Sequence, residues 1–207
     1  MARPGADPGV SRAPTGRSDE ALAARAAAGD RDAFGVLIDR YHGRVYRFAL
    51  VRLRCGADAA DVAQETLCRA WKSIGRFDPT RCFATWVLTI ARREVIGVVR
   101  TRRRKERDGA RERDRLGSAA DGRAPVDDVE MGDVWDVARR VLDAETFELV
   151  WLCYAEDRTP AQIARVIGST GVAVRVRLHR ARRKIEGACE EMTEDGATTG
   201  GGSYGAA

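Results

Sequence analysis

The residues best suited to chemistry in this chain are arginines near its C-terminus. Five of them fall within one predicted helix: Arg175, Arg177, Arg180, Arg182 and Arg183. Residues 160–185 carry seven basic side chains and no acidic one. Guanidinium groups early in such a helix can bind the edges of guanine bases, whereas those farther along can bind phosphates. We therefore predict a surface that binds nucleic acid, with Thr170 in the turn just before the helix.

The elements that must position these arginines form a predicted helix-turn-helix over residues 159–184. Thr159, Pro160 and Gln162 supply a capping box with proline at the first helical position, which starts the first helix. Gly168 allows a tight turn into the second helix, which would lie in the major groove of DNA. The alternative is a surface helical hairpin with no ligand, but the lopsided charge favours the nucleic-acid surface.

A second basic block follows a group of aromatic residues earlier in the chain. Residues 92–115 hold eleven Lys and Arg residues against five acidic ones, and 100–105 contains the densest run. Phe83 and Trp86 precede the block on the same predicted helix, and aromatic rings beside cations can stack unpaired bases. Two alternatives stay open, namely that the block is a solvated helix end and that each ring is a core residue.

A third polar surface lies on the helix predicted over residues 58–75, with Asp58 as its cap. Asp61 and Glu65 are one helical turn apart, and Gln64 lies beside them. Two carboxylates at this spacing could carry out acid–base chemistry, but the sequence shows no apolar pocket or basic partner nearby. We predict instead a surface that contacts another protein.

Several classes of site are disfavoured by the sequence. The five cysteines contain no CxxC pair, and neither histidine has ligand spacing from a cysteine, which argues against a zinc site. Nucleotide-binding and hydrolase signatures are missing as well. We expect a protein that is not an enzyme and that holds no metal or cofactor. A DNA-processing enzyme such as a recombinase is the alternative, but it needs a nucleophile that the N-terminal half does not convincingly supply.

Length and periodicity bound the architecture. The 207 residues are 44% hydrophobic but only 6% aromatic, which suits one domain or two small ones. Helical periodicity without strand-like alternation predicts an all-α fold of two small helical domains joined by a flexible linker. The expected divisions are a disordered N-terminus (1–17), a first domain (18–105), the linker (106–130), a helix-turn-helix domain (131–190) and a disordered tail (191–207).

The location of the protein follows from what its sequence lacks. It contains no apolar run of eighteen residues, and its N-terminus has no hydrophobic leader. We therefore expect a cytoplasmic protein without membrane insertion.

Three segments, taken together, resemble a known family. They are DAADVAQETLCRAW (58–71), FATWVLTIARREVIGVVRTRRR (83–104) and LVWLCYAEDRTPAQIARVIGSTGVAVRVRLHRARRKI (149–185). In this order, with a linker before the last, they are similar to bacterial RNA polymerase sigma factors of the extracytoplasmic-function (ECF) type. The other alternative, a helix-turn-helix regulator that binds DNA alone, leaves the first two segments unexplained.

The resemblance implies a role for each surface. The first domain would be sigma-2-like and would dock on the β′ clamp helices of core RNA polymerase through Asp61, Gln64 and Glu65. It would recognise and melt the −10 element of promoter DNA through Trp86, Arg92, Arg93, Arg100 and Arg103. The second domain would be sigma-4-like and would sit on the β flap, reading the −35 element through Thr170, Arg175, Arg177, Arg180, Arg182 and Arg183. Members of this family initiate transcription and are held by anti-sigma factors, so such a partner is expected.

The chain departs from the family pattern at positions near the DNA. Arg93 stands where the family usually has Asn, and Gly97 stands where Asp is common. The resemblance therefore leaves the promoter sequence open.

Overall fold

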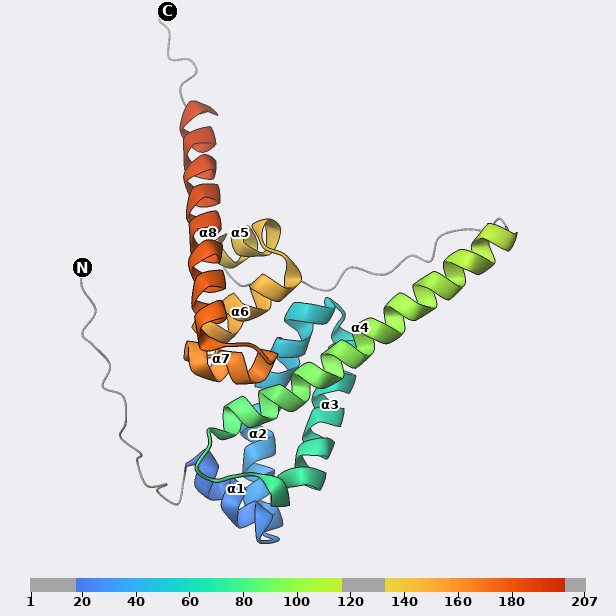
Figure 1. Ribbon diagram of the computed structural model, residues 1–207, viewed down its shortest axis with the longest axis vertical. Coiled ribbons are helices and arrows are strands. Elements are labelled where there is room, and N and C mark those ends of the chain that lie inside the picture. The colour runs from blue at the N-terminus through green and yellow to red at the C-terminus, as the bar shows by residue number, and fades with distance from the viewer. Residues whose placement is uncertain (1–17, 117–132, 200–207) are drawn as a thin grey trace, which may run out of the picture.

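Within each half of the chain, the fold is built from helices joined by short connections. The computed structural model describes residues 18–116 and 133–199. The N-terminal half contains α1 (Asp19–Ala27), α2 (Arg31–Leu53), α3 (Gly56–Ser73), the 3-10 turn η1 (Ile74–Arg76) and α4 (Phe83–Leu116) (Figure 1). The C-terminal half contains α5 (Asp133–Val141), α6 (Ala144–Tyr154), α7 (Pro160–Ile167) and α8 (Gly171–Thr199). The described ranges hold no strand, and the predicted all-α class is confirmed.

Side-chain caps fix where several helices begin. Asp30 accepts a hydrogen bond from the Ala33 amide at 3.0 Å and is therefore the N-terminal cap of α2. The expectation that Asp58 caps the next helix is wrong, because α3 begins at Gly56, with Cys55 at the cap position and no side-chain cap bond. Asp58 instead forms an ion pair with Arg102 of α4. A carboxylate inside the first turn is equally compatible with the sequence pattern, so position alone did not decide its role.

Three long helices form the core of the N-terminal half. α2, α3 and α4 pack together, and α1 lies against the first part of α2 (Figure 1). Val45 and Phe48 of α2 and Phe83 of α4 are fully buried between them. The buried Tyr41 hydroxyl donates a hydrogen bond to Asp19 at 2.6 Å, and burial raises the pKa of this tyrosine. That bond fixes α1 on α2.

The core of the C-terminal half combines aromatic and aliphatic side chains. Trp135 of α5 packs against Phe147 and Trp151 of α6, with ring centroids 5.9 and 5.3 Å apart. Ile163 of α7 and Val174 of α8 are fully buried. α8 therefore lies on a platform made by the three shorter helices.

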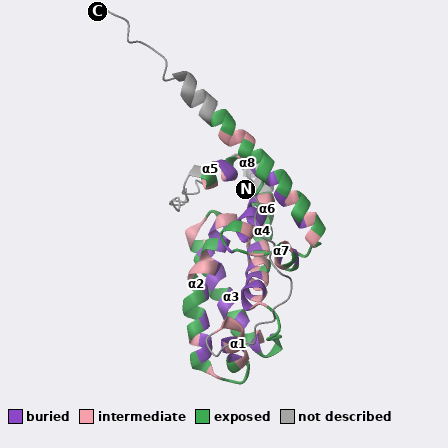
Figure 2. Ribbon diagram, turned by 90° about the vertical axis from the view of Figure 1, so that its left-hand side faces the viewer, coloured by how far each residue is buried: buried purple, intermediate pink, exposed green. Residues whose placement is uncertain are grey.

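The two halves touch rather than standing apart. α7 packs against α4, and α6 packs against α2. Buried apolar residues of both halves belong to one continuous cluster, and purple buried segments face the junction (Figure 2). The predicted division into two helical units is compatible with this arrangement, but the structure adds a contact between the units that the sequence did not suggest.

Two helices run past the boundaries that the sequence predicts. α4 continues beyond residue 105 to Leu116, and α8 continues beyond residue 190 to Thr199. The alternating charges after residue 105 suggested a linker, but the same alternation suits a solvent-exposed helix with ion pairs one turn apart. Arg104 and Asp108 form such a pair at 3.8 Å. The expectations for residues 1–17, for the rest of the linker (117–130) and for 200–207 lie outside the described residues.

Candidate nucleic-acid interface

Helices α7 and α8 form the predicted helix-turn-helix. The Thr159 amide donates to the Gln162 side chain at 2.9 Å, and the Gln162 amide donates to the Thr159 hydroxyl at 3.3 Å, which confirms the capping box. Gly168 ends α7 with a φ of +71°, a left-handed conformation that favours glycine. The Ala173 amide donates to Thr170 Oγ1 at 3.2 Å. Thr170 is therefore the N-terminal cap of α8.

The arginines predicted for α8 divide into two groups. Arg175, Arg180 and Arg183 are exposed to solvent. The other two, Arg177 and Arg182, contact side chains of α6. Arg177 lies 3.7 Å from Glu145, and Arg182 donates to the Tyr154 hydroxyl with its guanidinium 5.4 Å from the centre of that ring. At about 100° per residue, these two positions fall on the flanks of α8, next to α6.

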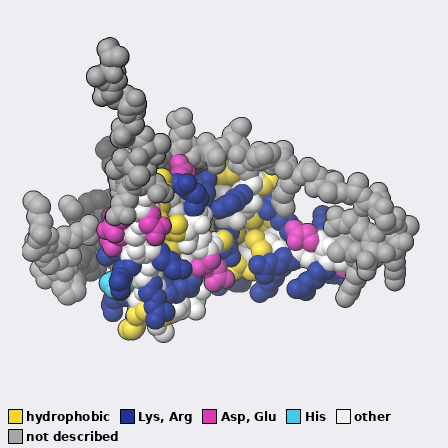
Figure 3. Space-filling view, turned by 90° about the horizontal axis from the view of Figure 1, so that it is seen from above, with side chains coloured by type: hydrophobic (Ala, Val, Ile, Leu, Met, Phe, Trp, Pro, Cys, Tyr) yellow, Lys and Arg dark blue, Asp and Glu magenta, His cyan; other side chains and the backbone are white. Residues whose placement is uncertain are grey.

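A second set of basic side chains lies along α4. Arg93, Arg100 and Arg103 are exposed, and Lys and Arg side chains crowd the face of the molecule seen from above (Figure 3). Arg102 differs because it is half-buried and donates to the Leu53 carbonyl at 2.9 Å. The outward arginines of α4 carry charge that a polyanion could neutralise.

Trp86 belongs to an aromatic cluster at the start of α4. Its ring centroid lies 5.2 Å from that of Phe77 and 5.6 Å from that of Phe83. Phe77 and Phe83 are buried, whereas Trp86 is half-buried and forms the outer edge of the cluster. The core interpretation therefore holds for Phe83, and Trp86 has a partly accessible ring.

Arg92 points toward the other half of the chain. Its Nε donates to Glu148 of α6 at 2.9 Å, and Arg52 of α2 lies 3.9 Å from the same carboxylate. Glu148 is only 4% exposed. Burial raises the pKa of Glu148, since the loss of hydration exceeds the opposing effect of Arg92 and Arg52. The structure thus places a predicted DNA-binding arginine in an internal ion pair.

A second buried carboxylate reinforces this contact. Glu156, which follows α6, accepts a hydrogen bond from Arg44 of α2 at 3.0 Å. Arg158 lies beside it and donates to the Cys82 sulfur at 3.1 Å. Sequence reasoning missed both Glu148 and Glu156. The one available signal was a glutamate inside the otherwise apolar run from 147 to 152, where a buried carboxylate needs a cationic partner.

The polar face of α3 is exposed, as predicted. Asp61, Gln64 and Glu65 all face solvent. Arg69 donates to Glu65 at 2.6 Å, and this hydrogen bond lowers the pKa of the Glu65 carboxyl. Arg69 also lies 2.9 Å from Glu94 of α4. The ion pairs fix the orientation of one side of this face.

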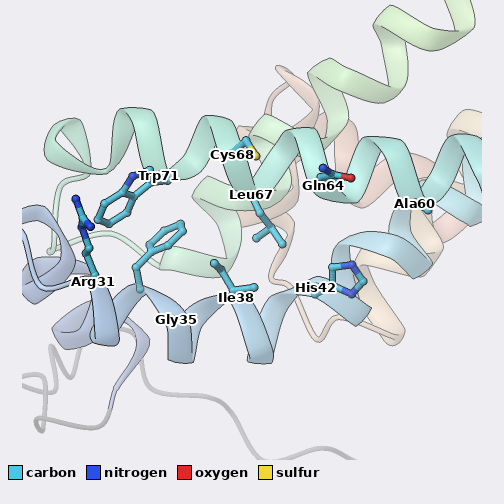
Figure 4. Close-up of a pocket in the computed structure, with 10 residues that line it drawn as sticks. Arg31, Gly35, Ile38, His42, Ala60, Gln64, Leu67, Cys68 and Trp71 are labelled. Carbon is cyan, nitrogen blue, oxygen red and sulfur yellow. The ribbon is translucent and has the colours of Figure 1, made fainter.

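An apolar groove runs between α2 and α3 beside this face. It has a volume of about 700 Å³, and Ile38 and Trp71 line it and are partly exposed (Figure 4). Gln64 lies at the same groove, on the α3 side. The sequence did not indicate this groove. Polar Gln64 and the apolar groove together form a surface suited to a helical protein partner.

Two further properties bear on the kind of site. Within residues 18–116 and 133–199, no three His, Cys, Asp or Glu side chains are grouped so as to hold a metal ion. Among the described helices, none is long and apolar enough to cross a membrane.

Comparison with known proteins assigns both halves of the chain. Residues 37–105 match the family described as Sigma-70 region 2, and residues 140–185 match Sigma-70, region 4. The ECF RNA polymerase sigma factor BldN of Streptomyces coelicolor is 34% identical over 183 residues, which cover 84% of this chain and 68% of that protein. The RNA polymerase sigma factor NccH of Alcaligenes xylosoxydans xylosoxydans is 31% identical over 173 residues, covering 81% and 92%.

A solved structure has a similar fold. CnrH, in complex with the cytosolic domain of CnrY, superimposes with a TM-score of 0.59 at 28% identity. The alignment covers 84% of this chain and 97% of CnrH. Fold and site together define a helical DNA-binding protein with a helix-turn-helix in its second half. The chain belongs to the sigma-70 family of RNA polymerase sigma factors, in its ECF group.

Proposed function

We propose that this chain binds core RNA polymerase, directs it to promoters with −10 and −35 elements, and helps to open the DNA. The observation that carries the proposal is the set of exposed arginines on the second helix of a helix-turn-helix, within the region 4 match: Arg175, Arg180 and Arg183. The region 2 match over 37–105 supports the polymerase-binding part. The chain would act in the cytoplasm, without catalytic activity or a cofactor of its own.

Core polymerase would bind the exposed face of α3. Asp61, Gln64 and Glu65 would contact the β′ clamp helices, and the region 4 half would rest on the β flap. Replacing Gln64 and Glu65 together with Ala should weaken the affinity for core polymerase, because the proposed contacts with the clamp helices are lost. Both side chains are exposed, so their removal should not disturb the core of the protein. The exposed Asp32 at the start of α2 is a charge-matched control outside the face of α3, and its replacement by Ala should leave that affinity unchanged.

The −10 element would bind along the first part of α4. Arg93, Arg100 and Arg103 are exposed and can bind phosphates, and the accessible edge of Trp86 can stack on an unpaired base. Arg92 would join them only after leaving Glu148. Assigning Arg92 to promoter DNA therefore requires the two halves of the chain to separate when the polymerase complex forms.

The −35 element would bind the outward face of α8. Arg175 and Arg180 lie nearest the start of the helix, where contacts with base edges are expected, and Arg183 lies nearer the flanking phosphates. Arg177 and Arg182 would hold α8 against α6 through Glu145 and Tyr154. They could contact DNA only after releasing these partners. Thr170 would bind DNA through the same residue that caps α8.

We also propose that an anti-sigma factor controls the chain. The similar protein CnrH was solved with the cytosolic domain of CnrY. In this chain, the groove between α2 and α3 offers the partly exposed Ile38 and Trp71 next to Gln64. An apolar partner helix seated there would compete with core polymerase for the same side of α3.

Run-off transcription with purified core polymerase tests the proposed function. A promoter library from the source genome should give transcripts that appear only when the chain is added. The rival, a helix-turn-helix regulator that acts alone, predicts DNA binding without core polymerase and no transcript that depends on the chain. That second result would overturn the proposal.

A further inference from the structure

The DNA-facing side of α8 carries two apolar side chains between its arginines. Val172 is 65% exposed and Val176 is 44% exposed, and both lie in the first two turns of α8. A single exposed valine is common on protein surfaces. Two of them, four residues apart at the start of a helix in a helix-turn-helix, occupy the positions from which such helices contact base edges.

The geometry of α8 centres these valines on its outer face. At about 100° per residue, Val172 and Val176 lie about 40° apart. The fully buried Val174 and the buried Ala181 lie on the opposite side, about 160° and 180° from Val172. Packing within the helix-turn-helix therefore uses the other side of α8 and leaves this pair facing outward.

Basic residues flank the pair on both sides. By the same rotation, Arg175 lies about 60° from Val172 in one direction and Arg180 about 80° in the other. Both are exposed. A protein partner would be expected to cover an apolar strip with apolar side chains, but cations on both edges favour a polyanion. A helix in the major groove of DNA has phosphate walls on both flanks and base edges at its centre.

We propose that Val172 and Val176 read thymine through its C5-methyl group in the −35 element. Within the major groove the methyl group of thymine is the one apolar feature of the base edges, and aliphatic side chains recognise it by excluding water. This inference rests on the proposed function. It adds an apolar source of sequence preference to the hydrogen bonds of the flanking arginines.

The test uses the full chain in complex with core polymerase. Promoters are selected from a library randomised in the −35 element, and the preferred sequence is then made with deoxyuridine in place of thymidine at one position at a time. Deoxyuridine pairs like thymidine but lacks the methyl group. The wild-type complex should lose about fourfold in transcription at one or two positions, the factor expected for burying one methyl-sized group.

Alanine variants identify which side chain reads the methyl group. Val172→Ala and Val176→Ala should each lose the thymine preference at one position and become insensitive to deoxyuridine there. Val134 of α5 is a matched control, since it is 62% exposed and lies off α8. Val134→Ala should retain the wild-type sensitivity at every position.

The outcomes separate this inference from the proposed function. Equal transcription from thymidine and deoxyuridine promoters at every position would overturn the role of the valines while leaving promoter selection intact. A deoxyuridine effect that persists unchanged in both alanine variants would overturn it as well. Failure to select any promoter would instead remove the proposed function itself.

Discussion

The C-terminal half of this sigma factor presents two faces of opposite charge. Toward the N-terminal half it presents Glu148 and Glu156, both buried against arginines of α2 and α4. Away from that half, α8 presents exposed arginines on either side of Val172 and Val176. One small helical unit thus carries buried carboxylates that pair with arginines of the N-terminal half and, on α8, arginines that are exposed to solvent.

The difference shows how the same residue type serves two purposes. Arg92 has a buried carboxylate partner within the chain, whereas Arg175 faces solvent. A buried ion pair adds little net stability, because desolvation offsets much of the attraction, but breaking one leaves a charge uncompensated. The inner pairs therefore specify how the halves fit together, and the outer arginines keep their charge for a ligand.

The largest expected effect is on the inner face. Glu148→Ala leaves the half-buried Arg92 without its carboxylate partner and leaves Arg52 with Glu145 alone at 3.9 Å, so we expect the free energy of unfolding to fall by about 3 kcal/mol. Urea unfolding measures this change. Glu145→Ala is the matched control on the same helix, because Glu145 is exposed and should contribute less than about 1 kcal/mol. Equal losses from the two variants would contradict the structural role of Glu148.

The next effect concerns the outer face. Arg175→Ala should reduce discrimination between the preferred −35 sequence and a single-base variant by about 2 kcal/mol, as expected for the loss of a bidentate contact with guanine. Run-off transcription from the two templates measures it. Arg182→Ala serves as the comparison, since Arg182 contacts Tyr154 and should lower transcription from both templates alike. If Arg182→Ala altered discrimination more than Arg175→Ala, the assignment of the two groups would be wrong.

A smaller effect is expected from the N-terminal cap of α7. Thr159 caps α7, the helix that packs both on α4 and under α8. Thr159→Ala should lower the free energy of unfolding by about 1 kcal/mol, because the Gln162 amide loses its acceptor. Thr159→Ser keeps the hydroxyl and should restore most of that loss, as thermal unfolding can show. A serine variant no more stable than the alanine variant would remove the capping explanation.

The smallest effect separates phosphate contacts from base contacts. Arg183→Ala should weaken binding of the polymerase complex to all promoters alike and reduce the salt dependence by about one counterion. Binding measured over a range of salt concentrations gives this slope. An unchanged slope together with a changed sequence preference would move Arg183 into the base-reading group.

The local features of the fold could be predicted from the sequence. Thr159 caps its helix as expected because a cap acts within three residues, which the sequence displays directly. The helix-turn-helix and its exposed arginines followed from the same short-range patterns. The start of α7 at Thr159 and its end at Gly168 each depend on residues within one helical turn, so both could be predicted without a structure.

The rest depends on contacts between distant residues. Arg92 and Glu148 are 56 positions apart, and nothing in the local pattern of α4 distinguishes Arg92 from Arg93. Arg177 and Arg182 were grouped with the other arginines of α8 because their orientation depends on where α6 lies. The role of Asp58 was decided by Arg102 of α4 in the same way.

The account rests most on separation of the N-terminal and C-terminal halves when the polymerase complex forms. Fluorophores carried by unnatural amino acids at the exposed positions Arg47 of α2 and Arg165 of α7 would report the distance between the halves. We expect high energy transfer in the isolated chain and a clear fall once core polymerase and promoter DNA are added. Unchanged energy transfer in a complex that is transcribing would contradict the release of Arg92 to DNA.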